Sequence, residues 1–173
     1  MADDLVVRRL EPAEAREHLD ALAAVVVDCV AGGASVSYMA PFSLADARAA
    51  VEPMVAEAEA GRRVLFAAFL DSELLGTVQV LLAFPPNQPH RGEIAKMLVH
   101  RSARNRGIGR LLMEQAEDVA RAEGKTLLVL DTANGTAARL YERCGWIKVG
   151  EIPGFALYPN GEPCATVFYY KEL

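Results

Sequence analysis

Residues 96–110 read KMLVHRSARNRGIGR, and they are the most informative part of the chain because they join a strand to a long helix. An apolar run from Met97 to Val99 is followed by a polar turn, and Gly107 and Gly109 stand where the helix begins. A helix N-terminus offers unpaired amides and a positive dipole end, and glycines allow a ligand close to the backbone. The stretch therefore predicts a site for a pyrophosphate or another small anion.

Four arginines lie between residues 101 and 110, with no acidic residue among them. The whole chain nevertheless has a net charge of −5, which argues against broad nucleic-acid binding, because such binding depends on many Lys and Arg contacts to phosphates. We expect a small negative ligand at this turn and no nucleic-acid partner. The plainer alternative is a solvated, arginine-rich helix start whose glycines only form the turn.

The glycines complete neither of two common nucleotide-binding motifs. A dinucleotide fingerprint needs a third glycine where Leu112 stands, although Asp131 lies near the distance and the strand end that this motif requires. A triphosphate-binding loop needs Gly-Lys-Ser/Thr, which is missing from this turn. What remains is the pattern Arg-x-x-Gly-x-Gly, from Arg104 to Gly109, between a strand and a helix.

Apolar periodicity and turn residues predict the other elements. Pro12 opens a helix that Gly32-Gly33 ends, Ser43 caps a second helix, and Pro53 kinks or divides this second helix. The remaining helices are expected from Arg106 and from Asn134. The predicted strands are 5–10, 64–70, 74–84, 93–99, 126–130, 146–152 and 165–170, with turns at 71–73, 153–154 and 160–161. The order is therefore βααβββαβαββ.

The Arg-x-x-Gly-x-Gly turn resembles the coenzyme A loop of the GNAT superfamily of N-acetyltransferases. Downstream, Asn134-x-x-Ala137-x-x-x-Tyr141-x-x-x-Gly145-Trp146 resembles the second signature of that family. The two signatures occur in the family's order, and the predicted element order follows the family fold over most of the chain. The resemblance implies an α/β (α+β) GNAT fold, with four helices and a central, mixed and mostly antiparallel sheet of about seven strands. It also implies that two strands of this sheet splay apart at the acetyl-CoA site.

The same resemblance implies acetyl-CoA as cosubstrate, and the spacings of the Cys and His residues form no zinc pattern, so no metal is expected. Residues 97–99 would present backbone groups to the pantetheine arm, and residues 104–110 would hold the pyrophosphate. Asn134 contacts the cofactor in similar proteins, although capping a helix is the commonest use of such an Asn. The implied cofactor-binding residues are Met97, Leu98, Val99, Arg104, Asn105, Arg106, Gly107, Ile108, Gly109, Arg110, Asn134 and Tyr141.

Acyl transfer to an amine needs a neutral amine, a polarised carbonyl and a proton for the departing thiolate. Tyr141 is the predicted acid, because the resemblance places its counterpart at the coenzyme A sulfur; burial as a core aromatic is the alternative. Glu93 opens a strand that resembles the one on which the histone-acetylating branch of the family carries its general-base glutamate, so the resemblance implies Glu93 as a candidate base. Asp131, at the end of the neighbouring strand, is the second candidate. Either one could instead bind the positive charge of the substrate or simply face solvent.

Segments 32–39, 130–132 and 150–155 resemble the tabtoxin-resistance branch of this superfamily, which acetylates an amino-acid analogue. This implies the primary amine of a small amino-acid-like or antibiotic-like molecule as acceptor, with Ser35, Ser37, Tyr38 and Phe155 as substrate-binding candidates. A first alternative is an enzyme whose acceptor is a protein N-terminus or lysine. A second is an acyl-CoA-binding regulator without turnover.

Composition predicts one domain over residues 1–173 in a cytoplasmic protein. Cys29, Cys144 and Cys164 have long, irregular spacings, which suit thiols in a reducing compartment better than disulfides or a zinc site. The first residues do not resemble a secretion signal, and no run approaches the roughly 20 apolar residues of a membrane span. We expect neither a membrane nor a metal partner, and both a monomer and a homodimer remain open.

Overall fold

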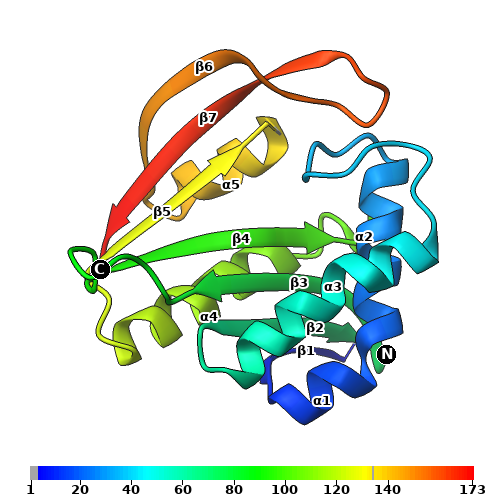
Figure 1. Ribbon diagram of the computed structural model, residues 1–173, viewed down its shortest axis with the longest axis horizontal. Helices are drawn as coiled ribbons and strands as arrows, with labels where there is room; N and C mark the ends of the chain where they lie inside the picture. The colour runs from blue at the N-terminus through cyan, green and yellow to red at the C-terminus, as the bar shows by residue number, and fades with distance from the viewer. Residues whose placement is uncertain (1–3, 134) are drawn as a thin grey trace.

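Seven strands form one mixed sheet in the computed structural model, which describes residues 4–133 and 135–173 (Figure 1). The strand order is β1-β2-β3-β4-β5-β7-β6, and each neighbouring pair is antiparallel except β4 with β5. The strands are β1 (Leu5–Leu10), β2 (Arg63–Leu70), β3 (Glu73–Leu81), β4 (Arg91–Val99), β5 (Leu127–Thr132), β6 (Ile147–Leu157) and β7 (Pro163–Glu172). The predicted mixed, mostly antiparallel sheet is confirmed.

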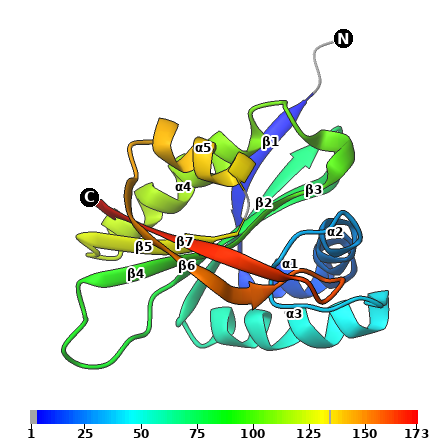
Figure 2. The ribbon, with the colours of Figure 1, turned by 90° about the horizontal axis from the view of Figure 1, so that it is seen from above.

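Five α-helices among the described residues cover the two faces of this sheet (Figure 2). They are α1 (Pro12–Glu17), α2 (Leu19–Ala31), α3 (Leu44–Glu59), α4 (Ile108–Ala122) and α5 (Gly135–Arg143), and a short 3-10 helix, η1 (Arg101–Ala103), precedes α4. The first three helices pack on one face, in a core that contains Val26 and Leu65. The other two pack on the opposite face, in a core that contains Leu112 and Tyr141.

The first predicted helix is divided in two, which gives five helices rather than the expected four. His18 ends α1 and begins α2, with φ −91° and ψ 12°, and this ψ lies outside the helical range. Its ring packs edge-on against Phe69 of β2, with 5.3 Å between the ring centroids. The apolar period continues through His18, so the pattern of residues contains no sign of the break.

Pro53 lies inside α3 without dividing it. Proline has no backbone N–H, so Pro53 cannot donate a hydrogen bond to the Ala49 carbonyl. Both residues are exposed, so water can bind this carbonyl instead. At the start of α3, Ser43 forms the expected cap. Asp46 N donates to Ser43 Oγ at 3.1 Å, and Ser43 N donates to Asp46 Oδ2 at 2.9 Å.

The edge strand β6 continues to Leu157, beyond its predicted end at residue 152. Its ladder with β7 is irregular between Ile152 and Ala156, where Pro153 and Gly154 stand. An edge strand tolerates a proline and a bulge, because one side of its backbone has no partner strand. The predicted turn at 153–154 is therefore wrong, whereas the expected turn at 160–161 is present and Gly161 has φ 90°.

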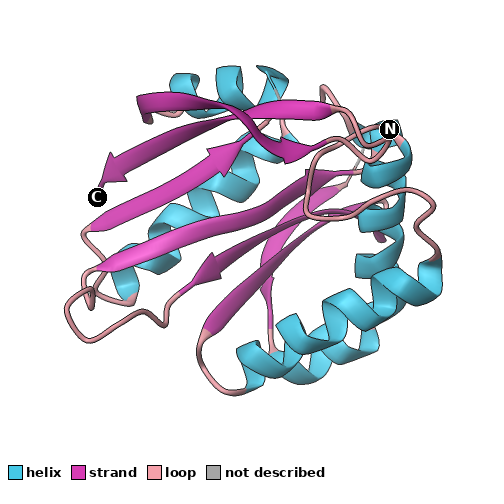
Figure 3. Ribbon diagram, turned by 45° about the horizontal axis from the view of Figure 1, so that its top comes forward, coloured by secondary structure: helices cyan, strands magenta, loops and turns pink. Residues whose placement is uncertain are grey.

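The parallel strands β4 and β5 are joined at one end and separated at the other, as Figure 3 shows. Residues 91–93 pair with residues 127–129, and beyond Glu93 and Val129 the described strands form no further pair. The predicted splaying of two strands is therefore confirmed. It opens the middle of the sheet toward solvent.

A β-bulge on the other edge of β4 lies beside this opening. Gln79 of β3 pairs with Ala95 while Thr77 pairs with Leu98, so β4 has one more residue than β3 over this stretch. Lys96, inside the bulge, has φ 49°. A bulge bends its strand and increases the local twist, which helps to turn β4 away from β5.

Candidate active site

A cleft of about 1620 Å³ opens where β4 and β5 separate. It brings together residues from β4, β5, the start of α4, α5, the loop before α3 and the end of β6. The predicted site residues that line it are Ser35, Ser37, Tyr38, Glu93, Met97, Leu98, Val99, Arg104, Asn105, Gly107, Ile108, Gly109, Arg110, Asp131, Tyr141 and Phe155. Arg106 does not line the cleft, and Asn134 lies outside the described residues.

The backbone at the start of α4 is suited to an anion. Gly107 is the N-cap with φ 79°, a conformation that costs little only for glycine, and it moves the helix start from the predicted Arg106 to Ile108. Asn105 is also left-handed, with φ 63°. The amides of Ile108 and Gly109 belong to the first turn, so they have no acceptor within the helix. Both residues line the cleft.

A glycine at position 109 is needed for the packing of α4, which the sequence did not reveal. A Cβ atom at this position would lie 2.9 Å from Leu140 Cδ2 of α5 and 3.8 Å from Met97 Sδ of β4. The missing side chain therefore lets α5 and β4 approach α4 closely. The sequence predicted that both glycines admit a ligand to the backbone. Only Gly107 has open space, since a Cβ there would meet no atom within 4 Å.

The arginines of this turn are less free than their sequence suggests. Arg101 Nε donates to Asp28 Oδ1 of α2 at 2.9 Å, and Arg110 Nε pairs with Glu114 Oε1 at 2.7 Å. Arg104 Nε donates to the Val99 carbonyl at 3.2 Å. The acids that neutralise Arg101 and Arg110 lie outside residues 101–110, which is why that run looked uncompensated. Of the four arginines, Arg104 and Arg110 line the cleft.

The edge of β4 that faces the opening supplies backbone groups to the cleft. Met97, Leu98 and Val99 follow the last pair that β4 forms with β5, so on this side they have no partner strand. The Val99 carbonyl is already used, because it accepts from Arg104 and from Cys29 Sγ at 3.6 Å. Met97 and Leu98 are thus the better-placed residues for backbone contacts to a ligand.

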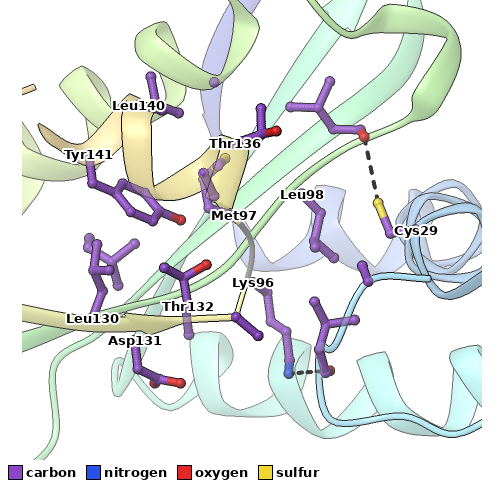
Figure 4. Close-up of a pocket in the computed structure, with 18 of the residues that line it drawn as sticks. Cys29, Lys96, Met97, Leu98, Leu130, Asp131, Thr132, Thr136, Leu140 and Tyr141 are labelled. Atoms are coloured by element: carbon purple, nitrogen blue, oxygen red, sulfur yellow. Dashed lines mark hydrogen bonds between the residues drawn. The ribbon is translucent and has the colours of Figure 1, made fainter. Parts of the chain in front are cut away.

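Tyr141 is a core residue and a cleft residue at once. Its side chain is 5% exposed, and its ring lies 6.2 Å from Trp146 and 6.0 Å from Tyr169, measured between ring centroids. Figure 4 shows the hydroxyl directed into the cleft, toward Met97 and Thr132. Burial, and then the negative charge of Asp131, raise the pKa of Tyr141 well above its ordinary value. The phenol therefore keeps its proton at neutral pH.

The two candidate bases lie on neighbouring strands at the joined end of the opening. Glu93 pairs in register with Val129, and Asp131 is two residues further along β5, on the same face as Val129. Glu93 Oε2 lies 3.5 Å from Arg91 Nη1. Desolvation raises the pKa of Asp131, and the positive charge of Lys96 partly opposes this. Both carboxylates line the cleft.

The loop before α3 is fastened to the β6–β7 hairpin over the cleft. Ser35 Oγ donates to the Leu157 carbonyl at 2.7 Å, and Ala40 N donates to the Pro159 carbonyl at 3.0 Å. Tyr38 stacks on Phe42 with 4.6 Å between ring centroids. Phe155 is 53% exposed and contacts Phe168 edge-on at 5.4 Å. Tyr38 and Phe155 thus provide aromatic walls, whereas the Ser35 hydroxyl serves the loop itself.

Lys96 is a cleft residue that the sequence reasoning did not single out. Its ammonium donates to the Val36 carbonyl at 2.9 Å and to Ser37 Oγ at 2.8 Å, so the Ser37 hydroxyl is also engaged. A sequence signal for it did exist, because Lys96 is the one basic residue inside the apolar strand pattern of residues 94–99. A charge in such a run usually has a specific partner.

All three cysteines are free thiols, and burial raises the pKa of Cys29 and of Cys144. Within residues 4–133 and 135–173, no cluster of three or more His, Cys, Asp or Glu side chains is placed to hold a metal ion. No helix in the described ranges is both long enough and apolar enough to cross a membrane.

Comparison with known proteins gives matches in sequence and in fold. Residues 16–146 match the model of the acetyltransferase (GNAT) family. A relative from Azospirillum brasilense, named IAA acetyltransferase, is 43% identical over 84 residues, which are 47% of this chain and 52% of that protein. The chain therefore matches only about half the length of that curated relative.

Two solved structures share the fold at low sequence identity. A Salmonella typhimurium protein, solved with its cofactor acetyl-CoA, superposes with a TM-score of 0.79 at 18% identity, over 98% of this chain and 94% of that one. The ribosomal-protein-alanine N-acetyltransferase of Brucella melitensis superposes with a TM-score of 0.78 at 21% identity, over 97% and 99% of the two chains.

The family match covers more than half of the chain and includes the β4–α4 turn and the α5 residues from which the resemblance was first drawn. The predicted GNAT fold is thereby confirmed, while acetyl-CoA-dependent transfer and the resemblance to the tabtoxin-resistance branch stay predictions. The chain belongs to the acetyltransferase (GNAT) family.

Proposed function

We propose that this acetyltransferase moves an acetyl group from acetyl-CoA directly to the primary amine of a small molecule. The observation that carries the proposal is the convergence of three features in one cleft. These are the first amides of α4, the buried Tyr141 phenol and the carboxylates of Glu93 and Asp131. Together they meet the needs of donor binding, thiolate protonation and amine deprotonation.

The donor is proposed to lie across the opening between β4 and β5. The amides of Ile108 and Gly109 and the side chains of Arg104 and Arg110 would hold its pyrophosphate. Met97 and Leu98 would offer backbone groups to its pantetheine arm, since this edge of β4 has no partner strand. The cradle is open, because a Cβ on Gly107 would meet no atom within 4 Å.

When bound, acetyl-CoA supplies a thioester carbonyl that an amine can attack and a thiolate that then needs a proton. Tyr141 holds a proton in the cleft, and its raised pKa keeps this proton available at neutral pH. A phenol with a raised pKa gives up its proton readily only to a strong base, and a thiolate newly formed in an apolar site is such a base. Tyr141 is therefore proposed as the general acid.

Glu93 and Asp131 are proposed to take up the proton that a substrate ammonium must lose before attack. Both lie near the joined end of β4 and β5. Their chain neighbours Ile94 and Leu130 belong to the core that includes α4, so strand alternation directs Glu93 and Asp131 to the opposite face. The desolvation that raises the pKa of Asp131 also makes it a stronger base when it is ionised. One carboxylate can act as base while the other holds the positive charge of the acceptor.

Direct transfer is favoured over an acyl-cysteine route. Cys29 and Cys144 line the cleft, but both have a raised pKa, so little of either thiol is ionised at neutral pH. The thiolate is the nucleophilic form. Cys144→Ala is accordingly expected to retain kcat within about twofold, and a loss near the hundredfold typical of a missing catalytic group would contradict direct transfer.

A small acceptor is favoured by the loop before α3, which is tied to β6 through Ser35 and Leu157 and to the following turn through Ala40 and Pro159. These bonds hold the loop, which lines the cleft through Ser35, Ser37 and Tyr38, against the hairpin. The resemblance to the tabtoxin-resistance branch supports the same class of acceptor. A protein N-terminus is the alternative, because one protein of this fold is a ribosomal-protein-alanine N-acetyltransferase.

The test is a panel of acceptors with acetyl-CoA and purified protein, followed by release of free thiol. Amino acids, polyamines, aminoglycosides and β-lactam amino acids represent the small amines, and peptides with a free N-terminus or a lysine represent proteins. Turnover above hydrolysis with a small amine is the expected result. Turnover with peptides alone would assign a protein acceptor, and tight acetyl-CoA binding without any turnover would assign a regulator.

We also propose that residues 1–173 form one domain and that the protein is cytoplasmic. Support for the first comes from the single sheet that includes every strand from β1 to β7. Support for the second comes from the free thiols of Cys29, Cys144 and Cys164, which suit a reducing compartment.

A further inference from the structure

Lys96 is placed in the cleft by an unusual backbone. It is the left-handed residue, with φ 49°, of the bulge that β4 forms opposite β3. A β-bulge next to an active site commonly re-aims a side chain. Figure 4 shows the Lys96 side chain extending from β4 toward the loop before α3, on the side of the cleft where Asp131 lies.

The contacts of Lys96 involve a second left-handed residue. Its ammonium donates to the Val36 carbonyl and to Ser37 Oγ, and it lies 5.1 Å from the centroid of the Tyr38 ring. Ser37 itself has φ 84°. Two non-glycine residues in this strained conformation therefore contact each other, and such strain persists where the surrounding structure holds a functional arrangement.

The charge of Lys96 is not neutralised by these contacts. Both hydrogen-bond acceptors are neutral oxygens, and among the described residues no carboxylate forms an ion pair with its ammonium. Asp131 acts on it only through space. The nearby cation Arg63 is already paired with Glu57, at 2.8 Å from Nε to Oε2. A cation that is largely withdrawn from water gains most from an anionic partner.

Lys96 and Asp131 therefore present opposite charges from the two separated strands. Asp131 is two residues beyond the last β5 residue that pairs with β4, and Lys96 is three residues beyond the last β4 residue of that ladder. An α-amino acid carries an ammonium and a carboxylate only a few bonds apart. Such a zwitterion would satisfy both groups at once, with the ammonium toward Asp131 and the carboxylate toward Lys96.

We propose that the acceptor is a zwitterionic amino acid or analogue, and that Lys96 is the residue that binds its carboxylate. The inference rests on the proposed function and specifies its substrate. A single ammonium with one remaining donor suits a carboxylate better than a phosphate, which needs several donors. Tyr38 and Phe155 on the adjoining walls would contact the apolar part of the acceptor.

The experiment compares each of the twenty L-amino acids with its own carboxamide, which keeps the amine and the side chain but lacks the negative charge. The quantity measured is the ratio of kcat/KM for acid and amide, in the wild type and in variants. For the preferred side chain, the wild type is expected to favour the acid by at least about tenfold, the effect of one modest charge-assisted contact. Lys96→Gln should reduce this ratio to about one, mainly by raising KM for the acid.

Two further variants separate carboxylate binding from fastening of the loop. Lys96→Arg keeps the charge and should keep part of the preference. Ser37→Ala removes one loop contact but keeps the ammonium, so it should lower acid and amide turnover alike and leave their ratio unchanged. Unaltered acetyl-CoA binding by Lys96→Gln shows that this variant is folded.

The proposal is overturned if the wild type uses amides or other uncharged amines as well as acids. It is also overturned if Lys96→Gln reduces both substrates equally, since Lys96 would then only hold the loop. In either case turnover of an amine would leave the proposed N-acetyltransferase function standing. Failure of every amine in the panel would instead overturn the proposed function itself.

Discussion

Leu140 Cδ2 of α5 lies 2.9 Å from the position that a Cβ atom on Gly109 of α4 would occupy. The lack of a side chain at Gly109 therefore allows α4, which is proposed to hold the pyrophosphate, to pack closely against α5, which carries Tyr141. An approach below 3.0 Å cannot be accommodated without movement. Donor binding and the position of the proposed acid are thus linked by one glycine.

We expect Gly109→Ala to lower the free energy of unfolding by about 1 kcal/mol, the low end of the usual cost of overpacking, because the atom that must shift is the end of the Leu140 side chain, and to weaken acetyl-CoA binding as Leu140 is displaced. Leu140→Ala in the same chain should remove the clash, so the two changes together should cost less than their sum. Urea unfolding and calorimetric titration with acetyl-CoA measure both effects. Strictly additive losses would show that the contact is not the cause.

Gly107→Ala is the matched control for that change. Gly107 has open space around it but φ 79°, so alanine should cost about 1–2 kcal/mol through the backbone alone. Leu140→Ala should give it no relief, because the two positions are not in contact.

A partly buried ion pair joins α4 to β7 and is expected to be important for stability. Lys171 Nζ lies 2.6 Å from Glu117 Oε2, and Trp146 Nε1 donates to Glu117 Oε1 at 2.9 Å. Glu117→Gln removes the charge that faces Lys171, which should cost about 2 kcal/mol in urea unfolding, below the range for fully buried pairs because the Lys171 side chain is 20% exposed. Glu114→Gln breaks an exposed pair with Arg110 and should cost less than about 1 kcal/mol. Equal losses for the two variants would contradict this assignment.

Tyr141→Phe should lower kcat by about 10²- to 10⁴-fold, the range for removal of a general acid, while acetyl-CoA affinity changes little. Tyr169→Phe is the control, because the Tyr169 hydroxyl donates to Glu142 at 2.9 Å, outside the cleft. It should retain most of the activity. If Tyr141→Phe turned over normally across the whole pH range, the acid role would be excluded.

Glu93→Gln and Asp131→Asn should identify the base. The base must be ionised to act, so activity rises with pH through its pKa, and replacing it should remove this acidic limb along with about 10²-fold or more of the rate. If Asp131 is the base, the limb lies above the ordinary Asp pKa of about 3.9, because desolvation raises the pKa of Asp131. Full activity of both variants would exclude both carboxylates.

Asp131 should also make the free energy of unfolding depend on pH. Its folded pKa is raised, so its contribution is fully present below the ordinary pKa of about 3.9 and is lost as pH rises through the raised value. Asp131→Asn should therefore match the wild type at low pH and exceed it in free energy of unfolding near pH 7. A variant that is less stable at pH 7 would show that the ionised carboxylate has a favourable partner in the fold.

Features that depend on spacing along the chain were predictable. The period of α4, the Ser43 cap of α3 and the turn at 160–161 follow from residues within a few positions of one another. The residues expected in the cleft also met there, apart from Arg106, and from Asn134, which lies outside the described residues. The break at His18 was missed because it depends on a tertiary contact with Phe69 rather than on the helix period.

The resemblance of two short signatures indicated the family and its seven-stranded sheet. The order and periodicity of the residues predicted most of the helices and strands, because these elements are defined by local backbone geometry. The donor site at the start of α4 stays a prediction from the same local pattern. The state of the side chains in the site required the folded chain. Asp28 neutralises Arg101 across 73 positions of sequence, and Lys96 meets Ser37 across 59. Such pairings arise from strand register, a bulge and the packing of distant loops, none of which has a signature in the local pattern of residues.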